Sequence, residues 1–321
     1  MKVKAPSAAD TTTLLTVNWF SAICLAAFLA IYASSAVAKT AAGGLNPAEK
    51  WIVAQVRAGE IADLSKQFPD KEKDKRKLSA HFVEALLTGT LPDVKPHRHG
   101  VRIIGAIIDE PVDLENAQIP CEVWLVHFQF NASTTFSGGG FSGIISFKNS
   151  AFKADASFAG MKVGRAILSD AMFEGPVDFT SADITSSFEA QWAKFQNKEN
   201  KAIFSGMKVG DFAFFNDAVF EGPVDLSYSD FAWLDLSSAS SPKVAAQLYM
   251  QGMSYKYIRA VPGNEPKSHT ALLTLADQSA YSADVYSKLE EFFLRQGYRG
   301  RCRQSIHCRK SSGARRILSQ R

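Results

Sequence analysis

Large apolar side chains recur every eleven residues through the middle of this chain, and this spacing limits the fold more than any other feature. Successive large residues stand alternately five and six positions apart, with a one-residue slip after Val163 and a polar insertion at 196–201. A helix would repeat them every three or four residues and a plain strand every two. The two interleaved series are Leu114, Leu125, Phe136, Phe147, Phe158, Leu168, Phe179, Phe204, Phe215 and Leu226, and Ile108, Ile119, Phe130, Phe141, Phe152, Val163, Phe173, Ile184, Val209, Phe220 and Phe231.

A chain wound into stacked coils explains this spacing. A small residue often precedes each large one by two positions, which fits a coil with four short sides and one large core residue on each. Coils of about 22 residues would stack about 4.8 Å apart through backbone hydrogen bonds. One coil cannot bury its own Phe side chains, but a stack buries a continuous column of them. The predicted fold is therefore mainly β, a four-sided β-solenoid over residues 101–240.

Recurring phrases support true repetition. The segment 158–164 (FAGMKVG) returns at 204–210 as FSGMKVG, and 174–179 (EGPVDF) returns at 221–226 as EGPVDL. Gly-Pro pairs in these phrases suit the corners of a coil.

Helical segments are expected on both sides of the repeats. Apolar periodicity and capping residues predict helices at 46–60 and from Leu78 to Gly89, and then at 244–259, 270–276 and 282–296. The charged run 70–77 between the first two is expected to be exposed to solvent. The predicted division is a signal peptide or anchor at 1–38, a helical N-terminal cap at 39–100, the solenoid at 101–240, a helical segment at 241–300, and a basic tail at 301–321.

The N-terminus has the features of an export signal. Lys2 and Lys4 precede an apolar run at 19–37, which ends in Ala36-Val37-Ala38. Small residues at Ala36 and Ala38 suit signal peptidase and predict cleavage after Ala38. About 19 apolar residues can also span a bilayer, so membrane association through residues 19–37 stays open. Either way the chain is expected to be exported, and to be periplasmic or anchored in the inner membrane.

Charge is distributed unevenly along the chain. About 18 acidic and 9 basic residues lie between Val101 and Leu236, a net charge of about −9, whereas 301–321 has about 7 basic residues and no acidic one. A basic tail can bind anionic surfaces. The family resemblance given below stops at Gly300, which suggests a shifted reading frame from Arg301 and would leave the tail without a selected role. Four scattered Cys give no zinc spacing.

The eleven-residue Phe ladder resembles the degenerate branch of the pentapeptide-repeat superfamily, whose unit centres on Phe or Leu after a small residue. Ala182-Asp183-Ile184-Thr185-Ser186 is nearest to the strict repeat. Residues 86–106 and 252–298 resemble the helical segments that precede and follow the repeats in a group of bacterial members. The resemblance covers roughly residues 46–300 and implies a right-handed quadrilateral solenoid. It implies no agreed activity, and no cofactor follows from it.

Few polar residues suggest chemistry. Asp113, Asp178 and Asp225 occupy one repeat position and could form an acidic column, although solvated charge beside the core explains them more simply. Paired carboxylates for glycoside hydrolysis need a set separation that spacing alone cannot show. His97-Arg98-His99 could contact a metal or phosphate but has no further ligand nearby, and the glycines at 138–140 lack the Lys-Ser/Thr of a phosphate loop. We therefore assign no catalytic, cofactor-binding or metal-binding residue.

Three functions fit these observations. The first is a non-catalytic structural or protein-interaction module of the bacterial cell envelope, presenting rigid faces to an unknown protein or envelope partner. The second is an acidic mimic of duplex DNA that binds a topoisomerase, which the charge of the repeats permits and the export signal opposes; no nucleic-acid partner is expected. The third is an envelope carbohydrate-active enzyme, for which the fold alone is a weak warrant.

Overall fold

The computed structural model describes residues 44–239, 248–261 and 267–297. The chain divides into two units, residues 1–46 and 47–321, and the second contains all the helices and strands described below. The N-terminal apolar run with Ala36 and Ala38, and the basic tail at 301–321, lie outside the described residues.

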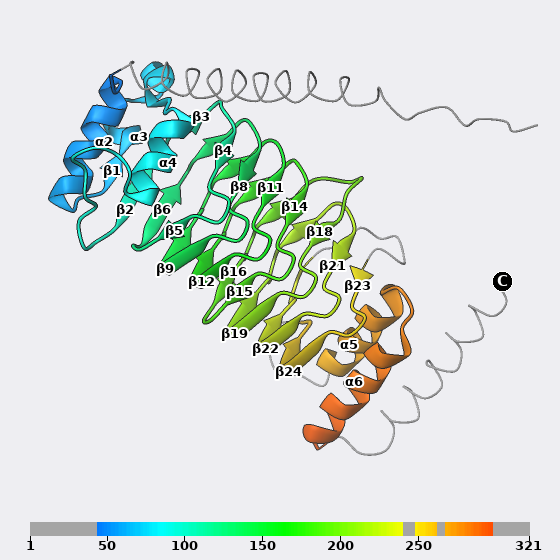
Figure 1. Cartoon of the computed structure of the whole chain (residues 1–321). Coiled ribbons are helices and arrows are strands. Elements are labelled where there is room, and N and C mark those ends of the chain that lie inside the picture. The colour runs from blue at the N-terminus through cyan, green and yellow to red at the C-terminus, as the bar shows by residue number, and fades with distance from the viewer. Residues whose placement is uncertain (1–43, 240–247, 262–266, 298–321) are drawn as a thin grey trace, which may run out of the picture. The chain divides into compact units, whose positions relative to one another are not determined.

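The central part of the chain is a parallel β-solenoid of about seven turns (Figure 1). All its described strand pairs are parallel and form three sheets along the solenoid. The eleven-stranded sheet contains β1 (Ala62–Asp63), β2 (Val101–Ile104), β5 (Gln118–Ile119), β6 (Val123–Val126), β9 (Gly140–Ser146), β12 (Lys162–Ile167), β15 (Asp183–Ile184), β16 (Phe188–Glu189), β19 (Lys208–Phe214), β22 (Asp230–Asp235) and β24 (Ser254–Arg259).

The other two sheets are built from strands of two residues. The six-stranded sheet contains β3 (Ile107–Ile108), β7 (Gln129–Phe130), β10 (Ala151–Phe152), β13 (Met172–Phe173), β17 (Lys194–Phe195) and β20 (Val219–Phe220). The seven-stranded sheet contains β4 (Val112–Asp113), β8 (Thr134–Thr135), β11 (Ala156–Ser157), β14 (Val177–Asp178), β18 (Ala202–Ile203), β21 (Val224–Asp225) and β23 (Leu248–Tyr249).

Residues with left-handed backbone, that is with positive φ, recur with the same eleven-residue period. A residue with positive φ stands in the turn before and after most strands of the eleven-stranded sheet, spaced by eleven from Gly105 through Gly160. The spacing drops to ten at Asp170, where the sequence predicts a slip, and widens between Trp192 and Gly206 across the predicted insertion. Because Gly, Asn and Asp tolerate this conformation, they hold many of these positions.

Phe side chains fill the core as stacks. Phe130, Phe152 and Phe173 lie ring over ring with centroids 4.7 and 4.8 Å apart, and the stack continues through Phe195 and Phe220. Each separation matches the distance between neighbouring strands. A second stack contains Phe136, Phe158, Phe179 and Phe204. The predicted core residues are all buried: Leu114, Leu125, Phe136, Phe147, Phe158, Phe179, Phe204, Phe215 and Leu226.

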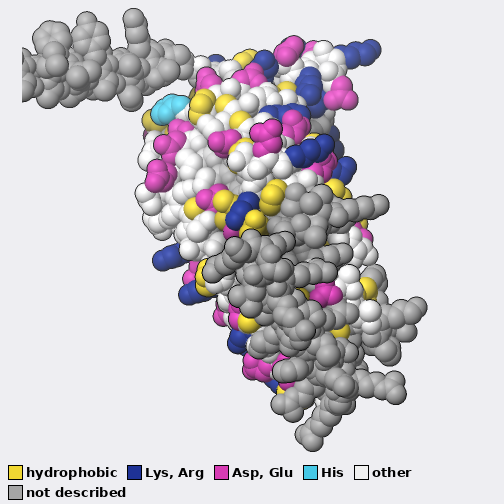
Figure 2. Space-filling view, turned by 90° about the vertical axis from the view of Figure 1, so that its right-hand side faces the viewer, with side chains coloured by type: hydrophobic (Ala, Val, Ile, Leu, Met, Phe, Trp, Pro, Cys, Tyr) yellow, Lys and Arg dark blue, Asp and Glu magenta, His cyan; other side chains and the backbone are white. Residues whose placement is uncertain are grey.

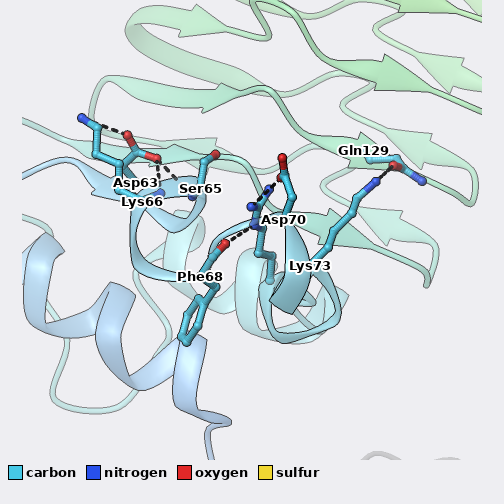
Figure 3. A network of polar contacts seen from close by, with 8 residues as sticks. Asp63, Ser65, Lys66, Phe68, Asp70, Lys73 and Gln129 are labelled. Atoms are coloured by element: carbon cyan, nitrogen blue, oxygen red, sulfur yellow. Dashed lines mark hydrogen bonds and ion pairs between the residues drawn. The ribbon is translucent and has the colours of Figure 1, made fainter.

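Short helices lie at the N-terminal end of the solenoid: α2 (Pro47–Ala58), α3 (Leu64–Gln67), the 3-10 segment η1 (Asp70–Arg76) and α4 (Ala80–Thr88). The charged run is not simply solvated, since Arg76 is buried and its Nε donates to the Phe68 carbonyl at 2.6 Å. Lys73 donates to Gln129 of β7 and ties this segment to the solenoid (Figure 3).

The prediction of a helix at 244–259 is wrong for its described part. Residues 248–259 form β23 and β24 and add a further coil, so the solenoid extends beyond the predicted boundary at 240. Tyr255 and Ile258 are three residues apart, which suits a helical face, but both point into the core from β24. Gly252 has the positive φ of the other turns. The helices α5 (Lys267–Gln278) and α6 (Ala283–Arg295) follow where helices were predicted.

Within the described part of the chain, no helix is both long and apolar enough to cross a membrane.

Candidate functional site

The three repeated aspartates do not form a catalytic pair. They lie in one row of the seven-stranded sheet, but β8 and β11 separate Asp113 from Asp178, and β18 separates Asp178 from Asp225. At about 4.8 Å per strand these gaps are roughly 14 and 10 Å, wider than the separations that glycosidases use. Each carboxylate instead accepts a hydrogen bond from a backbone N–H two residues ahead.

The protonation of Asp225 agrees with this structural role. Burial acts to raise its pKa, but hydrogen bonds from Ser227 and the ammonium of Lys201, 3.2 Å away, hold the pKa below its ordinary value. A general acid needs the opposite shift.

The predicted histidine motif caps a helix. His97 packs against Gly59, the residue that follows α2, and His99 Nδ1 lies 3.0 Å from the Gly59 carbonyl oxygen. Arg102 donates to the same oxygen at 2.6 Å. Carbonyls at a helix C-terminus lack intrahelical donors, so these contacts satisfy one of them. Among the described residues no three His, Cys, Asp or Glu side chains are grouped to hold a metal ion.

A shallow open groove runs beside this motif along the eleven-stranded sheet. Gln118, Ser142 and Lys162 line it, and its floor has no side chains where the glycines of β9 and β12 lie. Its end near His97 contains Cys121, whose pKa is raised by burial, so the thiol stays neutral. The glycines at 138–140 belong to this coil: the Gly140 N–H donates to the Ala117 carbonyl of the coil before, and the Gly138 N–H to the Ala159 carbonyl of the coil after.

The most unusual surface is the outward side of the C-terminal half of the long strands, here called the aromatic face. Its first row, in register from β2 to β24, is Arg102, Trp124, Ser146, Ile167, Glu189, Phe214, Asp235 and Arg259. Its second row, two residues earlier, contains Glu122, Ile144, Arg165, Ser187, Phe212, Trp233 and Tyr257. The residues between the rows, such as Ala166, Ala213 and Leu234, point into the core.

Aromatic rings gather at the C-terminal half of this face. Phe212 and Tyr257 have 43% and 49% of their surface exposed, unusual values for large apolar side chains. Phe212 and Trp233 have ring centroids 5.9 Å apart, and Trp233 and Tyr257 stack at 5.1 Å. Phe214 stacks on Phe212 at 5.5 Å. The rings of Phe212, Phe214, Trp233 and Tyr257 thus form one contiguous cluster.

The charged groups of the aromatic face are paired within the chain. Arg165 Nε donates to Glu189 at 2.6 Å, and Arg259 forms an ion pair with the buried Asp235. Arg102 lies over the Trp124 ring at 5.6 Å. Neither row contains a lysine. Aromatic residues and Arg are enriched, and Lys depleted, where proteins contact one another.

Sequence reasoning missed this surface because it followed only the side chains that point inward. A signal was present: Phe212 and Phe214 fall three and one positions before the ladder residue Phe215, where the repeats mostly have polar or small residues. An aromatic residue outside the core period is not needed for the solenoid.

Comparisons with protein-family models, with curated proteins and with solved structures found no match.

Proposed function

We propose that this protein is a non-catalytic interaction scaffold, in which a rigid solenoid presents the aromatic face to a protein partner. The observation that carries the proposal is the row Phe212, Trp233 and Tyr257: three large aromatic side chains held in register on strands while remaining partly exposed. A solenoid needs none of them for its core. Exposed aromatic clusters rimmed by paired polar groups are typical of protein-interaction sites.

A protein fits this face better than a sugar chain. A sugar ring stacks on an open aromatic face, but Tyr257 stacks on one side of Trp233 and Phe212 lies tilted by 48° on the other, which leaves less open ring face for a sugar. Side chains of another protein can pack against ring edges as readily as against ring faces.

Surface charge does not favour mimicry of duplex DNA. Such a mimic needs an uninterrupted acidic surface, whereas Lys and Arg are intermixed with Asp and Glu on the side of the molecule seen in Figure 2. On the aromatic face itself, Arg165 and Arg259 are paired with carboxylates.

The finer identity of the fold and the location belong to the same proposal. Turns with positive φ every eleven residues and one large core residue per short strand support a right-handed quadrilateral solenoid of the pentapeptide-repeat type. The charged start, apolar run and Ala36-Val37-Ala38 support export to the periplasm or anchoring in the inner membrane.

Site-specific photocrosslinking in cells tests the scaffold function. A benzophenone amino acid replacing Phe212 in the full chain should give a discrete crosslinked species on denaturing gels. The matched control replaces Ser157, which lies in the outward row of the seven-stranded sheet and is half-buried. Crosslinks that are absent at Phe212, Trp233 and Tyr257, or equally strong at Ser157, would reject the aromatic face as the binding surface.

A further inference from the structure

We infer that the partner of the aromatic face is a second copy of this chain, packed face to face with the two solenoids antiparallel. The inference rests on the proposed scaffold function and names its partner. The rows of the face are uneven: the N-terminal half presents Trp124, Ile144 and Ile167, and the C-terminal half presents most of the exposed rings. A two-fold axis parallel to the strands sets each half against the other.

One register of this pairing sets most apolar and cationic positions away from the axis against rings. In it Glu122 faces Tyr257, and Arg102 lies beyond the overlap. With the axis at the level of Ser187 and Glu189, Ile144 faces Trp233 of the other copy and Ile167 faces Phe214. These contacts pack apolar groups against rings, and the symmetry makes each of them twice.

The same register places arginines on rings. Arg259 faces Trp124 of the other copy and Arg165 faces Phe212, which are favourable cation–π partners. Ser146 faces Asp235. The two Glu189 side chains meet at the axis, where each already accepts from its own Arg165 at 2.6 Å, so two cations and two anions alternate there.

Shifting the axis by half a coil in either direction loses this match. One shift sets Asp235 against Ile167 and Glu189 against Phe214, and the other sets Arg102 against Arg259. In the first shift Glu189 would lose its remaining contact with water without gaining a partner, whereas Asp235 is already buried beside Arg259 and does not affect the choice. In the second shift the like charges of Arg102 and Arg259 repel. Charge complementarity therefore favours this register of the antiparallel pair over its two neighbours.

The size of the aromatic face limits how tightly two copies are expected to bind. Its rows run from Arg102 to Arg259 over seven strand spacings, roughly 34 Å at about 4.8 Å per strand. The fifteen residues of the two rows are fewer than the roughly 20–30 per side of a standard interface. We expect a reversible dimer with a dissociation constant in the micromolar range.

Crosslinking at the axis tests the register. In the full chain, purified in a mild detergent and with its four native cysteines changed to Ser, Ser187→Cys should be joined to its counterpart by a short bis-maleimide, because packed sheets lie about 10 Å apart. Ser157→Cys, on the seven-stranded sheet, is the matched control. A Ser187→Cys sample that crosslinks no faster than Ser157→Cys overturns the register.

A charge exchange tests the pairing by sedimentation equilibrium. Ile144→Arg and Trp233→Glu should each weaken dimerisation at least tenfold, and the double variant should recover most of it. The two positions lie four strands apart within one chain, roughly 19 Å, so only an intermolecular contact can explain the recovery. Circular dichroism confirms that each variant folds.

The outcomes separate the two proposals. A parent chain that stays monomeric to about 100 µM, well above a micromolar dissociation constant, or a Trp233→Glu variant that dimerises like the parent, overturns the second copy as partner. If Phe212 still crosslinks to another protein in cells, the scaffold function stands without it. If neither result appears, both proposals fail.

Discussion

Two sets of aromatic rings stack along this solenoid at nearly the same spacing, one inside and one outside. Within the core, Phe152 and Phe173 have centroids 4.8 Å apart and both are buried. On the aromatic face, Trp233 and Tyr257 stack at 5.1 Å, and Tyr257 is about half exposed. Both spacings follow from parallel strands in register. Geometry alone therefore does not reveal why a ring is present.

Burial separates the two sets. An inward Phe removes its whole side chain from water and touches rings on several sides, so the fold itself accounts for it. An outward ring gains only its contact with the neighbouring rings and leaves apolar surface in water. Substitutions in the inner stacks should therefore change the stability of the fold, and substitutions in the outer row should change binding. Each of the following substitutions tests this division.

Phe147→Ala should have the largest effect on stability. Phe147 is 1% exposed and lies edge-on to Phe136, Phe152 and Phe158, with centroids 5.0 to 5.6 Å away. Truncation should lower the free energy of unfolding by about 3–5 kcal/mol. Denaturant titration of the parent and the variant measures the loss. A loss below about 1 kcal/mol, the range of surface changes, would place Phe147 outside the core.

Gly210→Ala should lower the free energy of unfolding by less than Phe147→Ala, but it should disturb both the stacking of coils and the nearby aromatic face. Gly210 stands at the irregularity of β19 just before Phe212, and a Cβ there would lie 2.2 Å from the Thr185 carbonyl oxygen of the preceding coil. Backbone must shift to relieve this overlap, at about 1–3 kcal/mol. Gly89→Ala has open space at its Cβ and only the cost of positive φ, which makes it the control. Equal losses in the two variants would show that close stacking of coils does not require Gly210.

Asp235→Asn should remove a pH-dependent contribution to stability. Burial acts to raise the pKa of Asp235, but the Arg259 guanidinium and the Ser237 hydrogen bonds hold it below its ordinary value. The folded state therefore gains stability above the unfolded pKa of about 4, and the gain is lost as pH falls through the lower folded pKa.

We expect the substitution to cost about 1–2 kcal/mol at pH 7, because Arg259 is one-third exposed and partly screened. The melting temperatures of the parent and Asp235→Asn should approach each other as the pH is lowered from 7 to 3. Curves that stay parallel over this range would mean that the ion pair contributes no stability.

Much of the solenoid could be predicted because the spacing of large apolar residues in the sequence equals the spacing of core positions in the coils. Phe136 and Phe158 stand 22 residues apart, and their rings stack within 2° of parallel. The coil at 248–259 was missed because Tyr255 and Ile258 fit a helical face equally well, and only pairing with β22 decides between strand and helix. Phe212 and Phe214 hinted at the aromatic face, but its full extent depends on strand register, which decides which residues of neighbouring coils share an outward row.

Trp233→Ser should have the smallest effect on stability and therefore gives the sharpest test of the division between inner and outer rings. Trp233 projects outward between Phe212 and Tyr257, and its removal opens no cavity in the core. The free energy of unfolding should fall by less than about 1 kcal/mol, as for most surface changes. The same change should greatly reduce crosslinking from position 212, because the ring it removes lies in the middle of the proposed contact. Tyr228→Ser, at an exposed aromatic outside both rows, is the matched control and should leave the crosslink unchanged. A loss of several kcal/mol for Trp233→Ser would mean that the outer row stabilises the fold as the inner stacks do, and its exposure would no longer argue for binding.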